Sequence, residues 1–488
     1  MDRTPRTARL APVAALGLAL ALLAGCVPLP DVRAPAPAAD AVPRVAPADV
    51  PVATVEVPGV DVPGTPARYD AQTTLRWQRN EPIDTVVVAV PGLFGGAGQF
   101  APLARRIVAH APGVAVWAVD RRGNRLEDVA ARRRALDAPL ADVAEAFLPG
   151  ADGELGYVAP DPDAHRFVAD WGLDVHHGDL AAVVREARTE ADRVVLLGHS
   201  LGASLVATYA AWEDAAPVDG LILVDGAPGR TGAFGLEDGP RVLGVPVGLP
   251  DRAALAAGDA TPWLPYGPDG RIAARRFASA VLAHRAPDAT APAVVAPFPV
   301  SNRALYGLEN DDQYQPFQAS YASLGEATDA DLDGNLTAFL FGGGGLASRA
   351  ASVVGVAPGA ERVDWTAGDP ALERSDLAEQ AATWLHPGVD AAEWYLPAAM
   401  LLDLVALPPD LVDVPGYRPQ AEVGLPTLVV GSDRGLLRDR EAFAGYLAQR
   451  EGWPVSVALL EGLTHVDLLS ADVNPLAPLA ARWLSRLP

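Results

Sequence analysis

The chain has 488 residues, of which 50% are hydrophobic and 20% charged, a balance that excludes a wholly disordered or fibrous protein. Its formal net charge is −23, and a field of that sign repels phosphate backbones, so no nucleic-acid partner is expected. The single cysteine, Cys26, excludes an intramolecular disulfide and a cysteine-based zinc site.

The N-terminus has the order of charge and hydrophobicity of an export signal. Residues 1–25 carry three arginines and then an apolar run from Leu10 to Leu23, which is short for a membrane-spanning helix. The run ends in Leu23-Ala24-Gly25-Cys26, which resembles the lipobox of bacterial lipoproteins, whose cysteine is lipidated and becomes the first residue after cleavage. We therefore predict a signal peptide over 1–25 and an exported protein anchored to a membrane through lipidated Cys26.

Two other interpretations of the N-terminus remain open: a simple cleaved signal with a chance cysteine, and an uncleaved anchor. Val27 follows the cysteine in place of aspartate, which in lipoproteins of cells with two membranes favours the outer membrane. Residues 26–66 are rich in proline and alanine and show no sustained periodicity, so they predict an extended tether. The alternative is a segment that spans a cell wall or binds a partner.

The following region alternates β-branched runs with helix-like stretches, which predicts a mostly parallel sheet covered by helices on both faces. An N-terminal pair is expected near Tyr69–Arg79, and a closing helix begins after Asn474 and Pro475. Residues 121–171 and 227–424 do not fit the alternation, and the second stretch is too long for a loop. We predict a core over 67–226 and 425–488 with a cap or lid inserted at 227–424. The predicted core strands are Thr85–Val90, Val114–Val119, Arg193–Leu197, Leu221–Val224, Thr427–Val430 and Val455–Leu460.

A candidate nucleophile lies between the strand Arg193–Leu197 and a helical stretch of small residues. The sequence there is Gly198-His199-Ser200-Leu201-Gly202. A Gly-x-Ser-x-Gly pentapeptide between a strand and a helix predicts a nucleophile elbow, a turn in which small flanking residues avoid a clash. Because a serine hydroxyl is a poor nucleophile, Ser200 needs a histidine base and an acid that orients the histidine.

Both partners are expected downstream of the serine. Asp433 follows the apolar run Pro426–Gly431 and is the predicted acid, and His465 follows the last strand and is the predicted base. The alternative acid is Asp225, which follows the preceding strand. Asp467 is expected to brace the histidine loop.

The motifs and the chain order Ser, Asp, His resemble the α/β-hydrolase superfamily. The resemblance covers about residues 85–226 and 425–488 and includes the turn Asp120-Arg121-Arg122-Gly123. It implies an oxyanion hole built from the backbone N–H of Leu201 and one N–H of the loop Pro91–Gly96, for which Leu93 is the first candidate and Phe94 the second. Proline stands at 91 where many members carry histidine.

The predicted cap carries several further candidates. One or two of its aromatic residues are expected at the site. The run Asp329-Ala330-Asp331-Leu332-Asp333-Gly334 resembles half of an EF-hand, but Leu340 stands where the closing glutamate belongs, so a solvated acidic turn is favoured over calcium. Gly342–Gly345 fits a lid hinge or a surface loop. The cap aromatics are Trp263, Tyr266, Phe298, Tyr306, Tyr314, Phe317, Tyr321, Phe339 and Phe341.

These features predict an esterase-like or lipase-like serine hydrolase that cleaves carboxylic esters through an acyl-serine intermediate, without a cofactor or metal. The aromatic cap suggests a small, apolar ester as substrate, and the serine argues against the dehalogenase and epoxide hydrolase branches, which use aspartate. Two alternatives are a serine peptidase, such as an aminopeptidase that reads a substrate amine with acidic cap residues, and a noncatalytic surface lipoprotein.

Overall fold

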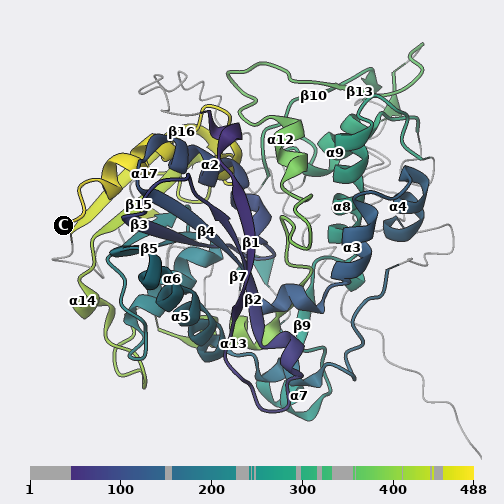
Figure 1. Ribbon diagram of the computed structural model, residues 1–488. Helices are drawn as coiled ribbons and strands as arrows, with labels where there is room; N and C mark the ends of the chain where they lie inside the picture. Colours follow the sequence, from purple (N-terminus) through teal and green to yellow (C-terminus); the bar gives the residue numbers. More distant parts are fainter. Residues whose placement is uncertain are drawn as a thin grey trace, which may run out of the picture.

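The computed structural model describes most of the chain from residue 46 onward (Figure 1). Cys26 and the predicted signal peptide lie outside the described residues. Within them, no helix is long and apolar enough to cross a membrane. The described ranges are 46–148, 157–226, 241–242, 245–246, 249–292, 298–315, 321–331, 355–357, 359–408, 410–439, 442–443 and 454–488.

An eight-stranded sheet forms the centre of the core, with the strand order β1-β2-β4-β3-β5-β6-β15-β16. Strand β2 pairs antiparallel with β1 and β4, and the other pairings in this sheet are parallel. The mostly parallel sheet is as predicted from the alternation of strands and helices. Its strands are β1 (Val52–Pro58), β2 (Ala71–Trp77), β3 (Thr85–Val90), β4 (Val114–Asp120), β5 (Arg193–His199), β6 (Gly220–Val224), β15 (Thr427–Arg434) and β16 (Val455–Thr464).

Helices cover both faces of this sheet because successive side chains of its central strands point to opposite sides. In β3, Val87 and Ala89 pack into one core cluster with α2 and α17, whereas Val86 and Val88 pack into the other with α5 and α6. The core helices are α2 (Ala101–His110), α5 (Leu173–Glu190), α6 (Leu201–Ala211), α13 (Ala398–Ala406), α14 (Gln420–Val423), α16 (Asp467–Ser470) and α17 (Leu476–Leu484).

A cap lies beside the sheet, on the right in Figure 1. It has its own buried cluster, in which Phe147, Phe277 and Trp394 lie within ring contact of one another. Its helices are α3 (Val129–Ala135), α4 (Leu140–Phe147), α8 (Arg271–Arg285), α9 (Asn302–Asn310) and α12 (Leu377–Ala382). Its short strands pair as β9 (Trp263–Pro265) with β14 (Tyr395–Pro397), β10 (Glu326–Thr328) with β13 (Asp364–Thr366), and β11 (Ala330–Asp331) with β12 (Gly355–Val356).

Several smaller elements join these parts. Helix α7 contacts α13, and strands β7 and β8 pair with each other. Their bounds are α7 (Arg252–Ala257), β7 (Arg241–Val242) and β8 (Val245–Pro246). The 3₁₀ turns are η1 (Pro47–Asp49), η2 (Ala67–Tyr69), η3 (Ala97–Phe100), η4 (Arg122–Leu126), η5 (Arg166–Asp170) and η6 (Pro268–Gly270).

Two predicted boundaries are wrong. The tether was placed over 26–66, but Val52–Pro58 forms the edge strand β1 and pairs along its whole length with β2. In β1 polar and apolar residues alternate only from Thr54 to Val57, and prolines lie on both sides of this run at positions 51 and 58, which is why an extended tether was predicted there. The cap was placed over 227–424 alone, but α4 packs against α8, and α13 returns to the core, where it packs on α5.

Candidate active site

Ser200 lies in the tight turn between β5 and α6. Its backbone has φ 56° and ψ −125°, a strained conformation for a residue with a side chain. The turn depends on glycine at its flanks: a Cβ on Gly198 would lie 2.3 Å from the carbonyl oxygen of Gly202, and one on Gly202 would lie 2.1 Å from that of Val90. The predicted elbow is therefore present, and it holds Ser200 above the carboxyl ends of the strands.

His465 lies in the turn after β16, and its partner is Asp225. The His465 Nδ1 donates to Asp225 Oδ2 at 2.6 Å, which leaves Nε2 as the ring nitrogen that can accept a proton. Asp225 also accepts the N–H groups of Leu436 and Leu437, both at 2.8 Å. Burial raises the pKa of Asp225, but these hydrogen bonds and the adjacent His465 outweigh it and hold the pKa below its usual value. Asp225 is thus an ionised, fixed acceptor for the histidine.

The prediction that Asp433 orients His465 is wrong. Strand β15 continues through Asp433 to Arg434, which pairs with Thr464 of β16, so Asp433 lies within the sheet. Its Oδ1 accepts the N–H of Gly462 at 2.7 Å and fastens β15 to β16. Strand β6, by contrast, ends at Val224, and Asp225 turns away with φ 47°. The alternative acid of the sequence analysis is therefore the one that contacts His465.

His199 is a site residue that sequence reasoning did not assign. Its ring packs on the ring of His465 with centroids 4.2 Å apart, and its Nε2–H donates to the His465 carbonyl oxygen at 3.0 Å. Burial, together with the neighbouring His465, lowers the pKa of His199 to about 3. His199 is therefore a neutral ring that fixes the position of the His465 backbone. Its place beside the serine in the pentapeptide was the available signal.

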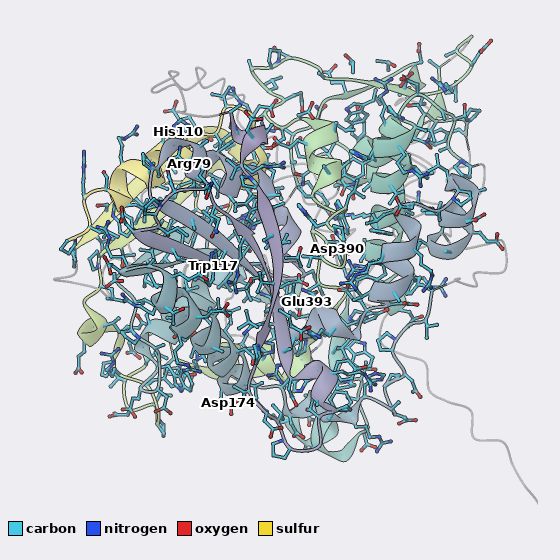
Figure 2. The ribbon with its side chains drawn as sticks, viewed as in Figure 1. Arg79, His110, Trp117, Asp174, Asp390 and Glu393 are labelled. Carbon is cyan, nitrogen blue, oxygen red and sulfur yellow. The ribbon has the colours of Figure 1, made fainter. Side chains whose placement is uncertain are left out.

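The loop Pro91–Gly96 touches the serine turn and is held from both sides. A Cβ on Gly92 would lie 2.7 Å from the Ser200 Cβ. Arg121 donates to the carbonyl oxygens of Pro91 at 2.6 Å and Gly92 at 2.9 Å, and pairs with buried Glu393 of the cap. Figure 2 shows Glu393 and Asp390 between the sheet and the cap helices. These contacts explain the presence of arginine in the Asp120–Gly123 turn.

Leu93 and Leu201 both lie next to Ser200. Leu93 lines the same cavity as Ser200, and Leu201 is the first residue of α6, where a backbone N–H has no acceptor within the helix. The role of their N–H groups as an oxyanion hole stays a prediction. Phe94, the second candidate, has φ 54° and stacks its ring on Tyr266 at a centroid distance of 5.0 Å.

Ser200 and His465 open into a cavity of about 230 Å³ between the core and the cap. Among the described residues, its walls carry no carboxylate. Of the predicted cap aromatics, Tyr266 and Tyr321 line it, as expected for one or two of that set, while Trp263 and Tyr306 are buried in the cap. Phe317, Phe339 and Phe341 lie outside the described residues. The lining consists of Gly92, Leu93, Phe94, Gly95, Gln99, His199, Ser200, Tyr266, Arg276, Asn310, Tyr321, Ala322, Gln380, Trp384, Ala391, Ala392, Leu436, His465 and Val466.

Asp467 braces the histidine loop, as predicted. Its Oδ2 accepts the N–H of Thr464 at 3.0 Å and the hydroxyl of Ser323 at 2.8 Å, and its Oδ1 accepts the Ser375 hydroxyl at 2.8 Å. Because Ser323 and Ser375 belong to the cap, one carboxylate couples the His465 turn to the cap.

The acidic groups that could hold a metal lie beside this brace and away from the predicted acidic turn. Carboxylate oxygens of Asp311, Asp312 and Glu373 lie within 4.8 Å of one another. Asp312 pairs with Arg434, and the other two accept backbone N–H groups. Asp329 lies in the bend between β10 and β11, and Asp331 is the second residue of β11, whereas Asp333 and Gly342–Gly345 lie outside the described residues.

Comparison with known protein families finds a match over the part of the chain that contains Ser200. The sequence model of a protein family, described as the alpha/beta hydrolase fold, matches residues 85–258, which include Ser200 and Asp225. The chain has the α/β-hydrolase fold. The matched part contains β3 to β6 of the sheet, and β15 and β16, which follow β6 in the sheet, lie outside it. No curated protein matches the sequence significantly.

Several solved structures are similar to this α/β-hydrolase fold. A candidate lipase from Sulfolobus solfataricus is 15% identical, with 90% of this chain and 94% of that chain covered and a TM-score of 0.48. An esterase from Thermogutta terrifontis is 10% identical, with 89% and 99% covered and a TM-score of 0.36. Epoxide hydrolase A from Mycobacterium thermoresistibile is 14% identical, with 89% and 99% covered and a TM-score of 0.39. Because these names span different reactions, they do not select one for this chain.

Proposed function

We propose that the chain is a serine hydrolase that cleaves small carboxylic esters through an acyl-Ser200 intermediate. The observation that carries the proposal is the Asp225–His465 hydrogen bond of 2.6 Å beside Ser200, in a turn that strains the serine backbone. A serine hydroxyl with a histidine oriented by a buried carboxylate is the arrangement that activates serine for acyl transfer.

The reaction follows from the roles of these groups. His465 Nε2 takes the Ser200 proton as the Oγ attacks the ester carbonyl carbon, and the N–H groups of Leu93 and Leu201 stabilise the oxyanion. His465 then gives the proton to the leaving alcohol oxygen, and the C–O bond breaks to leave the acyl-serine. A water molecule, deprotonated by His465, then attacks the acyl carbon. The bond between that carbon and the Ser200 Oγ breaks, His465 returns the proton to the Oγ, and the acid leaves.

The cavity favours an esterase over a lipase. Its volume of about 230 Å³ is below the roughly 300–1,000 Å³ of pockets that enclose drug-sized ligands. The small volume favours a short substrate. Polar side chains such as Gln99, Asn310 and Gln380 share the lining, so the substrate need not be wholly apolar, as the sequence had suggested. The peptidase alternative needs acids that read a substrate amine, and the described lining offers none.

A fluorophosphonate probe and a pair of chromogenic esters test the proposal. We expect the probe to label Ser200 in the purified chain, and the label to disappear in His465→Ala. We also expect 4-nitrophenyl butyrate to be cleaved faster than the palmitate ester, and Ser200→Ala to remove the turnover. A folded chain that takes no label and cleaves neither ester would instead support the noncatalytic binding alternative.

We also propose that Cys26 is lipidated and anchors the exported enzyme to a membrane. The support is the lipobox-like Leu23-Ala24-Gly25-Cys26 after an apolar run. Two or more acyl chains suffice for stable anchoring. In cells fed an alkyne fatty acid, we expect the wild-type protein to be labelled and to sediment with membranes, and Cys26→Ser to lose the label. Membrane sedimentation of Cys26→Ser equal to wild type would favour the uncleaved anchor.

A further inference from the structure

Arg276 is a buried cation in the wall of the cavity that holds Ser200 and His465. It lies on cap helix α8, and its residue is only 9% exposed. Transfer of a charge from water into a protein interior is costly unless an opposite charge accompanies it. The partners of Arg276 therefore decide whether the charge is balanced by the protein or by something that enters the cavity.

Its partners are phenols. The guanidinium Nη1 donates to the hydroxyl of Tyr266, Tyr321 is a second hydrogen-bond partner, and their rings lie 5.3 and 4.9 Å from the guanidinium carbon. A phenol is uncharged at neutral pH, and burial raises the pKa of Tyr266 further, to about 12. The two tyrosines hold the guanidinium in place without neutralising it.

The nearby acid is engaged elsewhere. Glu309 on α9 acts on Arg276 from beyond ion-pair distance, and it forms an ion pair with the adjacent Arg275. Within the described part of the chain, Arg276 forms no ion pair with a carboxylate. Glu309 thus pairs with Arg275, and among the described residues Arg276, which faces the cavity, has no carboxylate at ion-pair distance.

The cavity contrasts with the rest of the molecule in its charge. The chain carries a net charge of −23, yet the described cavity lining contains Arg276 and no carboxylate. A guanidinium offers several N–H donors in a planar fork, and a carboxylate binds to two of them at once. Tyr266 also stacks on Phe94 of the loop beside Ser200, so the arginine is fixed relative to the reacting centre.

We infer that Arg276 binds a carboxylate on the substrate, so that the enzyme prefers esters that carry a negative charge on the acyl or the alcohol part. The inference rests on the proposed esterase function and names its substrate class. Arg276 is the specificity-determining residue: it supplies the counter-charge, and Ser200 and His465 supply the chemistry. Neutral esters of the same length would leave the buried charge unbalanced.

Two matched pairs of esters test the preference in the full-length protein. The acyl-side pair is mono-4-nitrophenyl glutarate and its methyl ester, and the alcohol-side pair is 4-acetoxybenzoate and its methyl ester. In at least one pair we expect wild-type kcat/KM to favour the anionic ester about tenfold or more, as a charged hydrogen bond provides. In Arg276→Gln this ratio should fall to near one. Arg285→Gln, which removes an exposed arginine of the same helix, should keep the wild-type ratio.

A binding measurement separates failure of this inference from failure of the proposed function. Calorimetry on Ser200→Ala should detect glutarate or 4-hydroxybenzoate binding that weakens about tenfold or more when Arg276→Gln is added. If wild type cleaves none of the four esters in a Ser200-dependent way, the proposed function fails, and the calorimetry still decides the role of Arg276. Equal ratios in wild type, Arg276→Gln and Arg285→Gln, or a wild-type preference for neutral esters, would overturn the inference.

Discussion

Asp225 has an unusual backbone conformation and a buried charge, and each of these needs other contacts to stabilise it. Its φ of 47° places it in the left-handed region, and its carboxylate is fully buried. The N–H groups of Leu436 and Leu437, which come from the loop after β15, hold both oxygens. The acid therefore comes from one strand and its hydrogen-bond support from the next.

Removing the charge of Asp225 and removing that of Asp433 should lower kcat by very different amounts. Asp225→Asn keeps the size of the side chain but cannot hold His465 in the tautomer that leaves Nε2 unprotonated, so we expect kcat to fall on the order of 10³–10⁴-fold. Asp433→Asn retains an oxygen for the Gly462 N–H and should cost less than about tenfold. Steady-state kinetics with a short ester measures both. A larger loss of kcat in Asp433→Asn than in Asp225→Asn would mean that Asp433 is the acid that orients His465.

The neutral state of His199 predicts the shape of the acid limb of the pH–rate profile. Its pKa of about 3, a result of burial and of the adjacent His465, keeps it unprotonated above pH 4. The pKa of Asp225 is also held low, so the carboxylate stays ionised there. Because neither group changes its protonation state above pH 4, we expect the slope of log kcat/KM against pH not to exceed one there. A limiting slope of two above pH 4 would contradict the neutral assignment of His199.

At the scale of elements, the sequence was informative wherever a strand is buried on both faces and a motif follows it. Strands β3 to β6 read as continuous apolar runs, and the elbow after β5 identified Ser200. The acid was ambiguous because β6 and β15 are both apolar strands that lead into an aspartate. The strand that ends before its aspartate frees that side chain to reach His465, and the sequence does not show where each strand ends. Arg276 could not have been found, because the balance of a buried charge depends on contacts between cap helices.

The edge strand β1 is the element whose importance the sequence concealed, and truncation tests it. A chain that begins at residue 46 keeps β1, whereas one that begins at Gly59 loses seven residues paired with β2 and uncovers that strand. We expect the shorter chain to unfold with a free energy lower by on the order of 3 kcal/mol, because net backbone hydrogen bonds contribute about 1 kcal/mol each and ordering costs offset part of them. Equal melting temperatures for the two chains would show that β1 is dispensable.

For the whole molecule, stability depends on acids buried where the cap meets the core. Burial, with repulsion between neighbouring acids, raises the pKa of Asp120 and of Asp311 to about 8 and that of Asp312 and Glu373 to about 7. Buried histidines have the opposite shift: the pKa of His177 falls to about 3 and that of His386 to about 4, through burial. The two groups of residues therefore change stability in different pH ranges.

The signs predict that stability falls as pH rises through 7 and 8. Between about pH 4 and 6.5 the unfolded chain binds more protons at its histidines, which opposes the effect of the raised acids. Above about pH 7.5 the histidines no longer contribute: the folded state holds acid protons that the unfolded chain has lost, so stability falls as pH rises. We expect a loss on the order of 4 kcal/mol between pH 6.5 and 8.5. Thermal or denaturant unfolding across this range measures the loss of stability.

Two variants separate the effect of a buried acid from that of an exposed one. Asp120→Asn, whose amide oxygen can still accept the Ala97 N–H, should reduce the decline of stability with pH, and exposed Asp192→Asn should leave the decline as in wild type. Stability that rises from pH 6.5 to 8.5 would mean that these acids are ionised in the folded state.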